Sequence, residues 1–230
     1  MWEVIEGLKR AIELIVSGDP AVLDATFRSL YVSGTATLLA LVWSLPLGIL
    51  IGSKSFRGKK LVKGFFNALL GIPTVGLGLI LYLIFSKSGP LGTLHALYTP
   101  TAIIIGQAIL ITPIMVSFSA NAVEAIGKEV RDLAKTLGAS ESEASIAILR
   151  EALPGVTLAI IAGFNRAIAE LGIALMLGGN IAGLTRVLTT TIALETTRGN
   201  FELGIALTII LLSIVFTLNF AVNILKREQT

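Results

Sequence analysis

The sequence predicts an all-α integral membrane protein with five transmembrane helices, an amphipathic N-terminal helix and a cytoplasmic helical loop ahead of the fourth span. Three observations support this fold class. The mean hydropathy of the 230 residues is +0.85. Only 14% of the residues are charged, whereas a soluble domain carries about a quarter. Several apolar stretches have the ~20 residues needed to cross a bilayer. With no internal repeat, we expect residues 1–230 to form a single transmembrane domain.

Residues 1–19 precede the first span and are expected to form a short amphipathic helix. Such a helix lies either on a membrane surface or on neighbouring helices. Asp19 followed by Pro20 has the pattern of an N-cap and a first-turn proline, so a new helix should begin there. The apolar residues that recur near one face of the N-terminal helix are Trp2, Ile5, Leu8, Ile12 and Ile15.

The five predicted spans are separated by loops that differ in charge. Basic residues accumulate in cytoplasmic loops. Residues 54–63, the loop after the third span and the C-terminal tail hold eleven of the eighteen basic residues. We therefore expect the N-terminus outside, the C-terminus in the cytoplasm, and residues 86–100 and 180–202 outside. The spans run over Leu30–Gly52, Phe65–Phe85, Thr99–Phe118, Pro154–Gly178 and Leu203–Leu225.

The third loop, residues 121–153, is polar but has the pattern of two helices. Gly138 can end the first helix in a left-handed cap. Ser140 with Glu143 three residues later is a capping-box pattern for the second helix, which is expected to reach Pro154, where the fourth span opens. Either this loop is a solvated connector or it is a docking surface for a separate cytoplasmic protein. The apolar stripe of its first helix is Val123, Ile126, Val130, Leu133 and Leu137.

One motif in this loop resembles a known family. Asp132-Leu133-Ala134, with Gly138 four residues later and Leu153-Pro154 at the end, resembles the EAA loop of ABC-importer permeases. Asp and Leu stand where the family pattern has Glu and Ala, and the gap from glycine to proline is longer. The resemblance implies the type I ABC importer transmembrane fold, with short coupling helices seated in a groove of the ATPase subunit. The residues implied to couple to the ATPase are Asp132, Leu133, Ala134, Gly138, Ala139 and Ser140.

A second stretch, residues 164–204, is similar to permeases for oxyanions such as molybdate, tungstate and sulfate, and its part from Gly178 to Gly204 is most similar to the tungstate-type branch. This resemblance implies a permease homodimer in a prokaryotic cell membrane, working with a cytoplasmic ABC ATPase and an external oxyanion-binding protein. ATP and Mg would be bound by the ATPase, with no cofactor on this chain. Tungstate is the expected substrate, with molybdate or sulfate as alternatives. Arg186 and Arg198 in the external loop are expected to contact the binding protein.

Arg166 and Glu170 are a charged pair inside the predicted fourth span. Four residues apart, they share a helix face and can pair. Ionisable residues in mid-membrane cost a few kcal/mol at least and are functional candidates. Either the pair only pins helices together, or Arg166 faces the translocation path and meets a tetrahedral dianion. Asn165 and Asn180 could line the same route.

Prolines inside the spans mark weak points in the helices. Pro73 with Thr74, and Thr112 with Pro113, are candidates for a gate, because proline removes a backbone hydrogen bond and can kink a helix. Kinked packing without gating is the more common outcome.

Other chemistry is not indicated. The chain has no cysteine. No metal site, catalytic residue or nucleic-acid surface is expected, and "GSKSFRGKK" departs from a phosphate-binding loop in spacing and context. The chain is therefore not expected to be an enzyme. The other class in play is a self-sufficient secondary transporter or channel, which would predict ion-coupling residues in several spans and an inverted repeat.

Overall fold

The computed structural model of the chain describes residues 2–227, and among these it describes the side chains of 7–127 and 129–221. In this part of the chain the regular elements are helices. In chain order they are α1 (Trp2–Val16), α2 (Pro20–Ser53), α3 (Lys59–Leu69), α4 (Thr74–Phe85), a 3₁₀ turn at Gly92–Leu94, α5 (Pro100–Thr136), α6 (Glu141–Ile168), α7 (Gly172–Gly178), α8 (Leu188–Thr197) and α9 (Phe201–Arg227).

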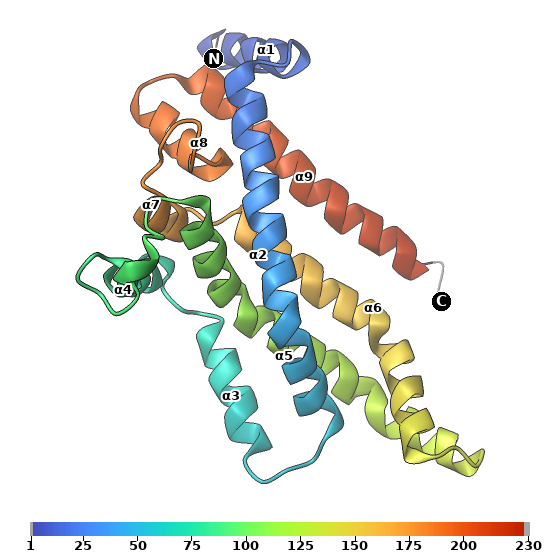
Figure 1. Cartoon of the computed structure of the whole chain (residues 1–230). Helices are drawn as coiled ribbons and strands as arrows, with labels where there is room; N and C mark the ends of the chain where they lie inside the picture. The colour runs from blue at the N-terminus through green and yellow to red at the C-terminus, as the bar shows by residue number, and fades with distance from the viewer. Residues whose placement is uncertain (1, 228–230) are drawn as a thin grey trace.

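Four helices are long and apolar enough to cross a membrane: α2, α5 over Pro100–Gly127, α6, and α9 over Phe201–Ala221. The connection between α5 and α6 lies at one end of the molecule, and α1 and α8 lie at the other (Figure 1). This arrangement, with α3 and α4 as a possible fifth crossing, agrees with the predicted all-α membrane fold.

The second predicted span, Phe65–Phe85, is wrong as a single helix. It is broken between Leu69 and Thr74, and α3 and α4 are bent by 95° relative to each other. Pro73 stands in the break and adopts an extended conformation as the N-cap of α4. A proline lacks the backbone N–H and disfavours helical geometry in the residue before it, which accounts for the break.

The core is built on the packing of α2 and α6 against α5, and α2 and α6 also contact each other. Small residues allow this close approach: a Cβ added at Gly52 would lie 2.7 Å from the carbonyl oxygen of Ala120. The "GILIG" pattern, Gly48–Gly52, therefore serves contacts within the chain. The largest buried cluster is shared among α2, α5, α6 and α7, and includes Val32, Ala36, Ile103, Ile111, Met115, Ala167 and Ala174.

The α5–α6 hairpin (residues 121–153) is less separate from the spans than predicted. α5 continues without a break from Pro100 to Thr136. α6 begins at Glu141 and passes through Pro154 to Ile168, so Pro154 lies inside a helix and does not open a new one. Since the proline removes only one helical hydrogen bond, the turns on either side hold the helix together. The expected caps at Gly138 (φ +84°) and Ser140–Glu143 are confirmed.

Two further differences lie between Ile168 and Phe201. The predicted fourth span, Pro154–Gly178, is split, because α6 ends at Ile168 and the short α7 follows after three residues. The following loop, residues 180–202, contains the helix α8, which packs against α9. Its first turn is capped by a threonine hydroxyl, since the Oγ1 of Thr190 accepts a hydrogen bond of 2.9 Å from the backbone N–H of Val187.

The N-terminal helix is confirmed, and it packs on α9. Ala11 is fully buried in a cluster with Ala206 and Leu207. The N-cap at Asp19 is confirmed as well: its carboxylate accepts hydrogen bonds from the backbone N–H groups of Ala21 at 2.9 Å and Val22 at 3.2 Å. The sequence predicted that this helix lies either on a membrane surface or on neighbouring helices, and the structure shows the second.

Candidate functional site

Arg166 and Glu170 form the predicted ion pair, at the place where α6 ends and turns toward α7. Nη1 of Arg166 lies 2.6 Å from Oε2 of Glu170. Glu170 is two residues beyond the last residue of α6, and Ala169 before it has a turn conformation (φ −85°, ψ 0°) that does not yet lead the chain away from the helix. The i, i+4 spacing therefore still brings the two side chains together. We call residues 165–173 the Arg166–Glu170 corner.

Glu170 makes more contacts than its sequence position predicted. Its side chain is 2% exposed, and Oε1 accepts a hydrogen bond of 3.0 Å from the backbone N–H of Ile173, in the first turn of α7. Its backbone carbonyl accepts a hydrogen bond of 2.8 Å from the Oγ1 of Thr189, on α8. One residue thus joins the end of α6 to α7 and α8. The contact with α7 could have been predicted from the sequence, because Glu170 lies just before a short apolar helix and an acidic side chain is stabilised at a helix N-terminus.

The other member of the pair reaches the surface. The side chain of Arg166 is 35% exposed, so the guanidinium is not enclosed with its partner. Next to it in sequence, Oδ1 of Asn165 is buried without a hydrogen-bond partner among the described residues. The corner therefore offers a half-exposed guanidinium, held by one nitrogen, to an anion.

Asn180 does not join the corner through any hydrogen bond of the described residues but forms part of the loop before α8. It has a positive φ of 52°. Its Oδ1 accepts a hydrogen bond from Nε of Arg186, and its carbonyl oxygen accepts one from Nη2 of the same residue, both at 3.3 Å. Arg198 is likewise held within its own region, with Nη1 3.1 Å from Oε1 of Glu195. Both arginines expected to contact a binding protein thus have partners within this chain.

The candidate gate residues lie at two different joints. Pro73 and Thr74 stand at the bend between α3 and α4, beside the start of α7: a Cβ added at Gly172 would lie 3.1 Å from Oγ1 of Thr74. Thr112 accepts a hydrogen bond of 2.8 Å from Nε1 of Trp43, which ties α5 to α2. Pro113 is buried inside α5. The Trp43 contact was not predicted, because no local pattern links residues so far apart.

The hairpin leaves apolar side chains uncovered. Leu133 is 62% exposed and Leu137 is 79% exposed, close to the turn. Nothing lies within 4 Å of where a side chain would begin at Gly138. The remaining residues predicted to couple here, Asp132, Ala134, Ala139 and Ser140, lie along the same turn, with the side chains of Asp132 and Ser140 exposed. An exposed apolar patch of this kind is typical of an interaction surface.

Internal ion pairs keep the two arms of the hairpin together. Oε2 of Glu141 lies 3.0 Å from Nη1 of Arg131, and Lys135 pairs with the same carboxylate. Ser140 and Glu143 add the capping box, in which the Ser140 backbone N–H donates to Oε2 of Glu143 at 2.8 Å. The hairpin is therefore braced from within, although the space beside Gly138 at its tip is open.

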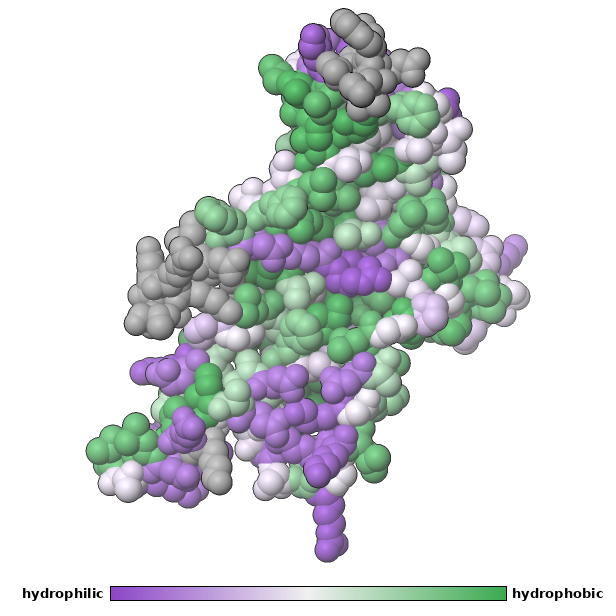
Figure 2. Space-filling view, turned by 180° about the vertical axis from the view of Figure 1, so that it is seen from behind, coloured by the Kyte–Doolittle hydropathy of each residue, from purple (hydrophilic) through white to green (hydrophobic). Residues whose placement is uncertain are grey.

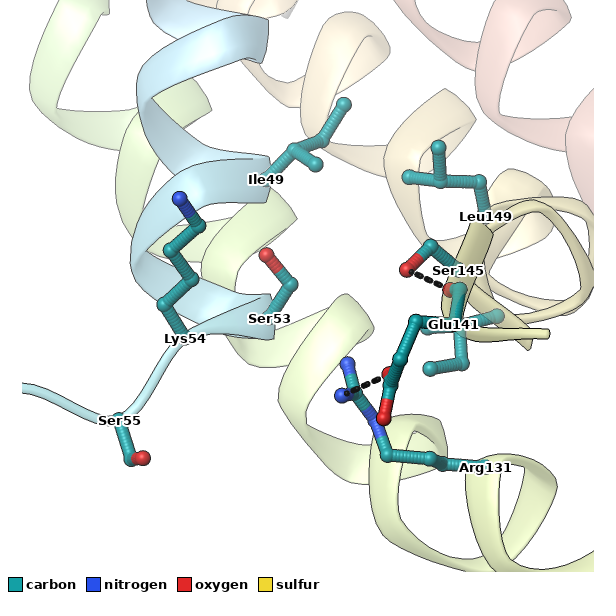
Figure 3. Close-up of a pocket in the computed structure, with 9 residues that line it drawn as sticks. Ile49, Ser53, Lys54, Ser55, Arg131, Glu141, Ser145 and Leu149 are labelled. Carbon is teal, nitrogen blue, oxygen red and sulfur yellow. Dashed lines mark hydrogen bonds and ion pairs between the residues drawn. The ribbon is translucent and has the colours of Figure 1, made fainter. Parts of the chain in front are cut away.

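A hollow of about 450 Å³ separates this brace from the end of α2 (Figure 3). Ile49, Ser53 and Lys54 line it from the α2 side, while Arg131 and Glu141 face it from the hairpin. The hairpin therefore contacts α2 near Ile49 and Val123, while the ion pairs closer to its tip are separated from α2 by the hollow. Among the described residues, no group of three or more His, Cys, Asp or Glu side chains could hold a metal ion.

Comparison with known proteins places the chain in a family. The family described as "Binding-protein-dependent transport system inner membrane component" matches residues 44–229. The tungstate uptake system permease protein TupB of Peptoclostridium acidaminophilum is 40% identical, over 99% of this chain and 100% of that protein. TupB of Campylobacter jejuni is 37% identical, over 97% of this chain and 94% of that protein.

The fold is also found among solved structures. The inward-facing MetNI methionine ABC transporter matches with a TM-score of 0.68 and 18% identity, over 91% of this chain and 96% of that chain. The fold is thus that of type I ABC importer permeases, as the sequence predicted, and the apolar helices make the chain a multi-pass membrane protein. The chain belongs to the family of binding-protein-dependent transport system inner membrane components.

Proposed function

We propose that this chain is the permease subunit of an ATP-driven importer, which moves tungstate from an external binding protein to the cytoplasm. The observation that carries the proposal is the 40% identity to a tungstate permease over nearly the whole chain. Relatives named for molybdenum or sulfate transport are less similar, at 30% and 25% identity, which supports tungstate as the first choice among tetrahedral oxyanions.

Arg166 is the group that meets the anion. Its planar guanidinium presents several N–H donors to the oxygens of an oxyanion, and Glu170 occupies only part of that capacity. In a low-dielectric site a lone cation would hold a dianion too tightly for rapid release. Glu170 lowers the net charge of the corner and fixes the guanidinium in place, so the anion is bound weakly and passed on.

The hairpin transmits conformational changes of the ATPase to the membrane-spanning helices of this chain. Its exposed Leu133 and Leu137 dock on a cytoplasmic ATPase, which binds ATP and Mg, while this chain carries neither. The braced arms of the hairpin continue directly into α5 and α6, so a displacement of the tip moves both helices. α6 runs from the hairpin to the Arg166–Glu170 corner, so a movement of the tip also moves the corner. This movement would open the path to one side of the membrane and close it to the other. A second copy of the chain completes the path.

The orientation has the N-terminus outside and the C-terminus in the cytoplasm. Support comes from charge and from shape: the hairpin lies at the end of the molecule opposite α1 and α8 (Figure 1). The five basic residues of the stretch 54–63 lie in the connection from α2 to α3 and at the start of α3, at the hairpin end. The external binding protein then meets the end that carries α1, α8, Arg186 and Arg198.

The test is uptake by the whole importer reconstituted in liposomes, with its ATPase inside and its binding protein outside. We expect tungstate to accumulate only when ATP is enclosed, and to do so in the presence of an equal concentration of molybdate or sulfate, measured by elemental mass spectrometry. Uptake without ATP would indicate a secondary transporter or channel. Preferential accumulation of molybdate or sulfate would contradict the substrate assignment.

A further inference from the structure

The helix α3 has a face that the rest of the chain leaves uncovered. None of its eleven residues is buried. Leu61 is 80% exposed and Phe65 is 60% exposed, and because they are four residues apart they lie on the same side of the helix. α3 also turns 95° away from α4, so it does not continue a straight membrane crossing. In Figure 1 α3 runs alongside α2 with its first turn at the hairpin end, so its exposed apolar side chains follow the direction of a membrane-crossing helix, as the acyl chains of lipids do.

Positive charge gathers beside this apolar face. The stretch 54–63 contains five basic residues. A hollow of about 830 Å³ lies against α3 and is lined by Phe56, Lys59, Lys60, Leu61, Lys63 and Asn67, among others. The carboxylate in its lining is that of Glu124, from α5. Figure 2 shows the hairpin end of the molecule as largely hydrophilic.

The single carboxylate is already engaged. Oε1 of Glu124 lies 3.1 Å from Nζ of Lys59, and Lys63 pairs with its other oxygen. These contacts hold the start of α3 on α5 and set the shape of the hollow. With the described residues, Lys60 forms no ion pair, so its ammonium group stays available for a ligand. The hollow thus combines a fixed wall with an excess of positive charge.

We infer that this hollow binds the headgroup of an anionic phospholipid, whose acyl chains lie along Leu61 and Phe65. The phosphate meets Lys60 at the rim, while the lysine–Glu124 contacts hold the wall in place. A free inorganic anion would use the charges but not the neighbouring apolar face, and a zwitterionic lipid would use the apolar face but gain little from the charges. The site is independent of the transported substrate.

The inference is tested on the full chain purified in a neutral detergent, with lipid adducts counted by native mass spectrometry. We expect phosphatidylglycerol to be retained over phosphatidylcholine. Lys60→Gln should weaken retention of phosphatidylglycerol about fivefold, since each lysine near an anionic lipid surface contributes about that factor. Lys87→Gln, which removes an exposed lysine from the loop after α4, is the matched control and should change nothing.

A second variant separates a lipid from a free anion. Phe65→Ser removes exposed apolar surface without touching the charges, so it should also reduce phosphatidylglycerol retention. Equal retention of the two lipids by the unmodified chain would overturn the inference, as would equal losses in Lys60→Gln and Lys87→Gln. Full displacement of the lipid by millimolar inorganic phosphate, with no effect of Phe65→Ser, would assign the hollow to a free anion instead. Helical content by circular dichroism confirms that each variant is folded.

Discussion

The Arg166–Glu170 corner and the tip of the hairpin are constructed in opposite ways. In the corner, both carboxylate oxygens of Glu170 have partners inside the chain, and the side chain is 2% exposed. At the tip, Leu137 is 79% exposed and Gly138 faces open space. Buried polar groups that are hydrogen-bonded within the chain stabilise its fold, whereas exposed apolar patches are typical of surfaces that bind another molecule. Changes in the corner should therefore affect folding first, and changes at the tip should affect assembly first.

The largest effect is expected for Glu170→Gln. The variant leaves Arg166 without its carboxylate, and because that guanidinium is 35% exposed the cost should fall below the ~3 kcal/mol of a fully buried pair. We expect less folded protein and a lower unfolding temperature, measured by size-exclusion chromatography and thermal unfolding in detergent. The matched control is Glu13→Gln, which makes the same change in the exposed Arg10–Glu13 pair and should be nearly neutral. Equal stability of the two variants would mean that the corner is not holding the helices.

At the tip, Gly138→Glu should reduce assembly with the ATPase while leaving the chain folded. The left-handed backbone at Gly138 costs a side chain about 1–2 kcal/mol, and the added bulk obstructs docking. We expect a folded chain that captures less ATPase, with substrate-stimulated hydrolysis lowered about tenfold or more. Gly183→Glu is the control for ATPase capture, because Gly183 also has positive φ (73°) and open surroundings. It lies in the loop proposed to meet the binding protein, so it is compared on ATPase capture alone. Normal assembly and transport in Gly138→Glu would contradict the docking role.

Arg166→Lys tests whether the corner also acts in transport, because this change should lower transport while the corner stays folded. Lysine keeps the charge beside Glu170 but loses the planar fork. The loss of about one good hydrogen bond to the anion, roughly 1.4 kcal/mol, corresponds to a tenfold fall in transport. Assembly and basal ATP hydrolysis should stay at the level of the unmodified importer. A lysine variant that transports at the original rate would show that the fork does not meet the anion.

The smallest effect is expected at the external arginines. Charge reversal at Arg186 would also disturb its hydrogen bonds to Asn180, and reversal at Arg198 would place a carboxylate beside Glu195. Arg198→Gln is therefore the cleaner change. We expect affinity for the binding protein to fall about threefold at low salt and to differ little at high salt. Crosslinkers at these positions that capture only the ATPase would show that the orientation is inverted.

Local patterns in the sequence predicted the local structure well. The Ser140–Glu143 capping box, the left-handed Gly138, the Asp19 cap and the Arg166–Glu170 pair each depend on residues within four positions of one another, and each is present. The directions of the helix axes and the contacts between distant residues could not be predicted from local patterns. Proline marked Pro73 as a possible kink, but hydropathy records the length of an apolar run and not the direction of its axis, so neither the 95° size of the bend nor the break into two helices was predicted.

The roles of Glu170 and Trp43 show the same limit. Glu170 was found as a partner of Arg166, but its bond to Ile173 and the bond from Thr189 depend on how α7 and α8 fold back. The contact between Trp43 and Thr112 joins residues on two different helices. Pro154 misled in another way, because a proline is tolerated inside a long helix when its neighbours keep their hydrogen bonds.

The most direct test of the account is transport by the double variant Arg166→Met, Glu170→Gln. The introduced glutamine keeps an oxygen that can accept the hydrogen bond from Ile173, and no charge is left unpaired, so we expect this variant to fold better than Glu170→Gln alone. In liposomes with the ATPase and the binding protein, it should hydrolyse ATP but accumulate no tungstate. Tungstate uptake at the rate of the unmodified importer would contradict the account and leave the corner as a purely structural pair.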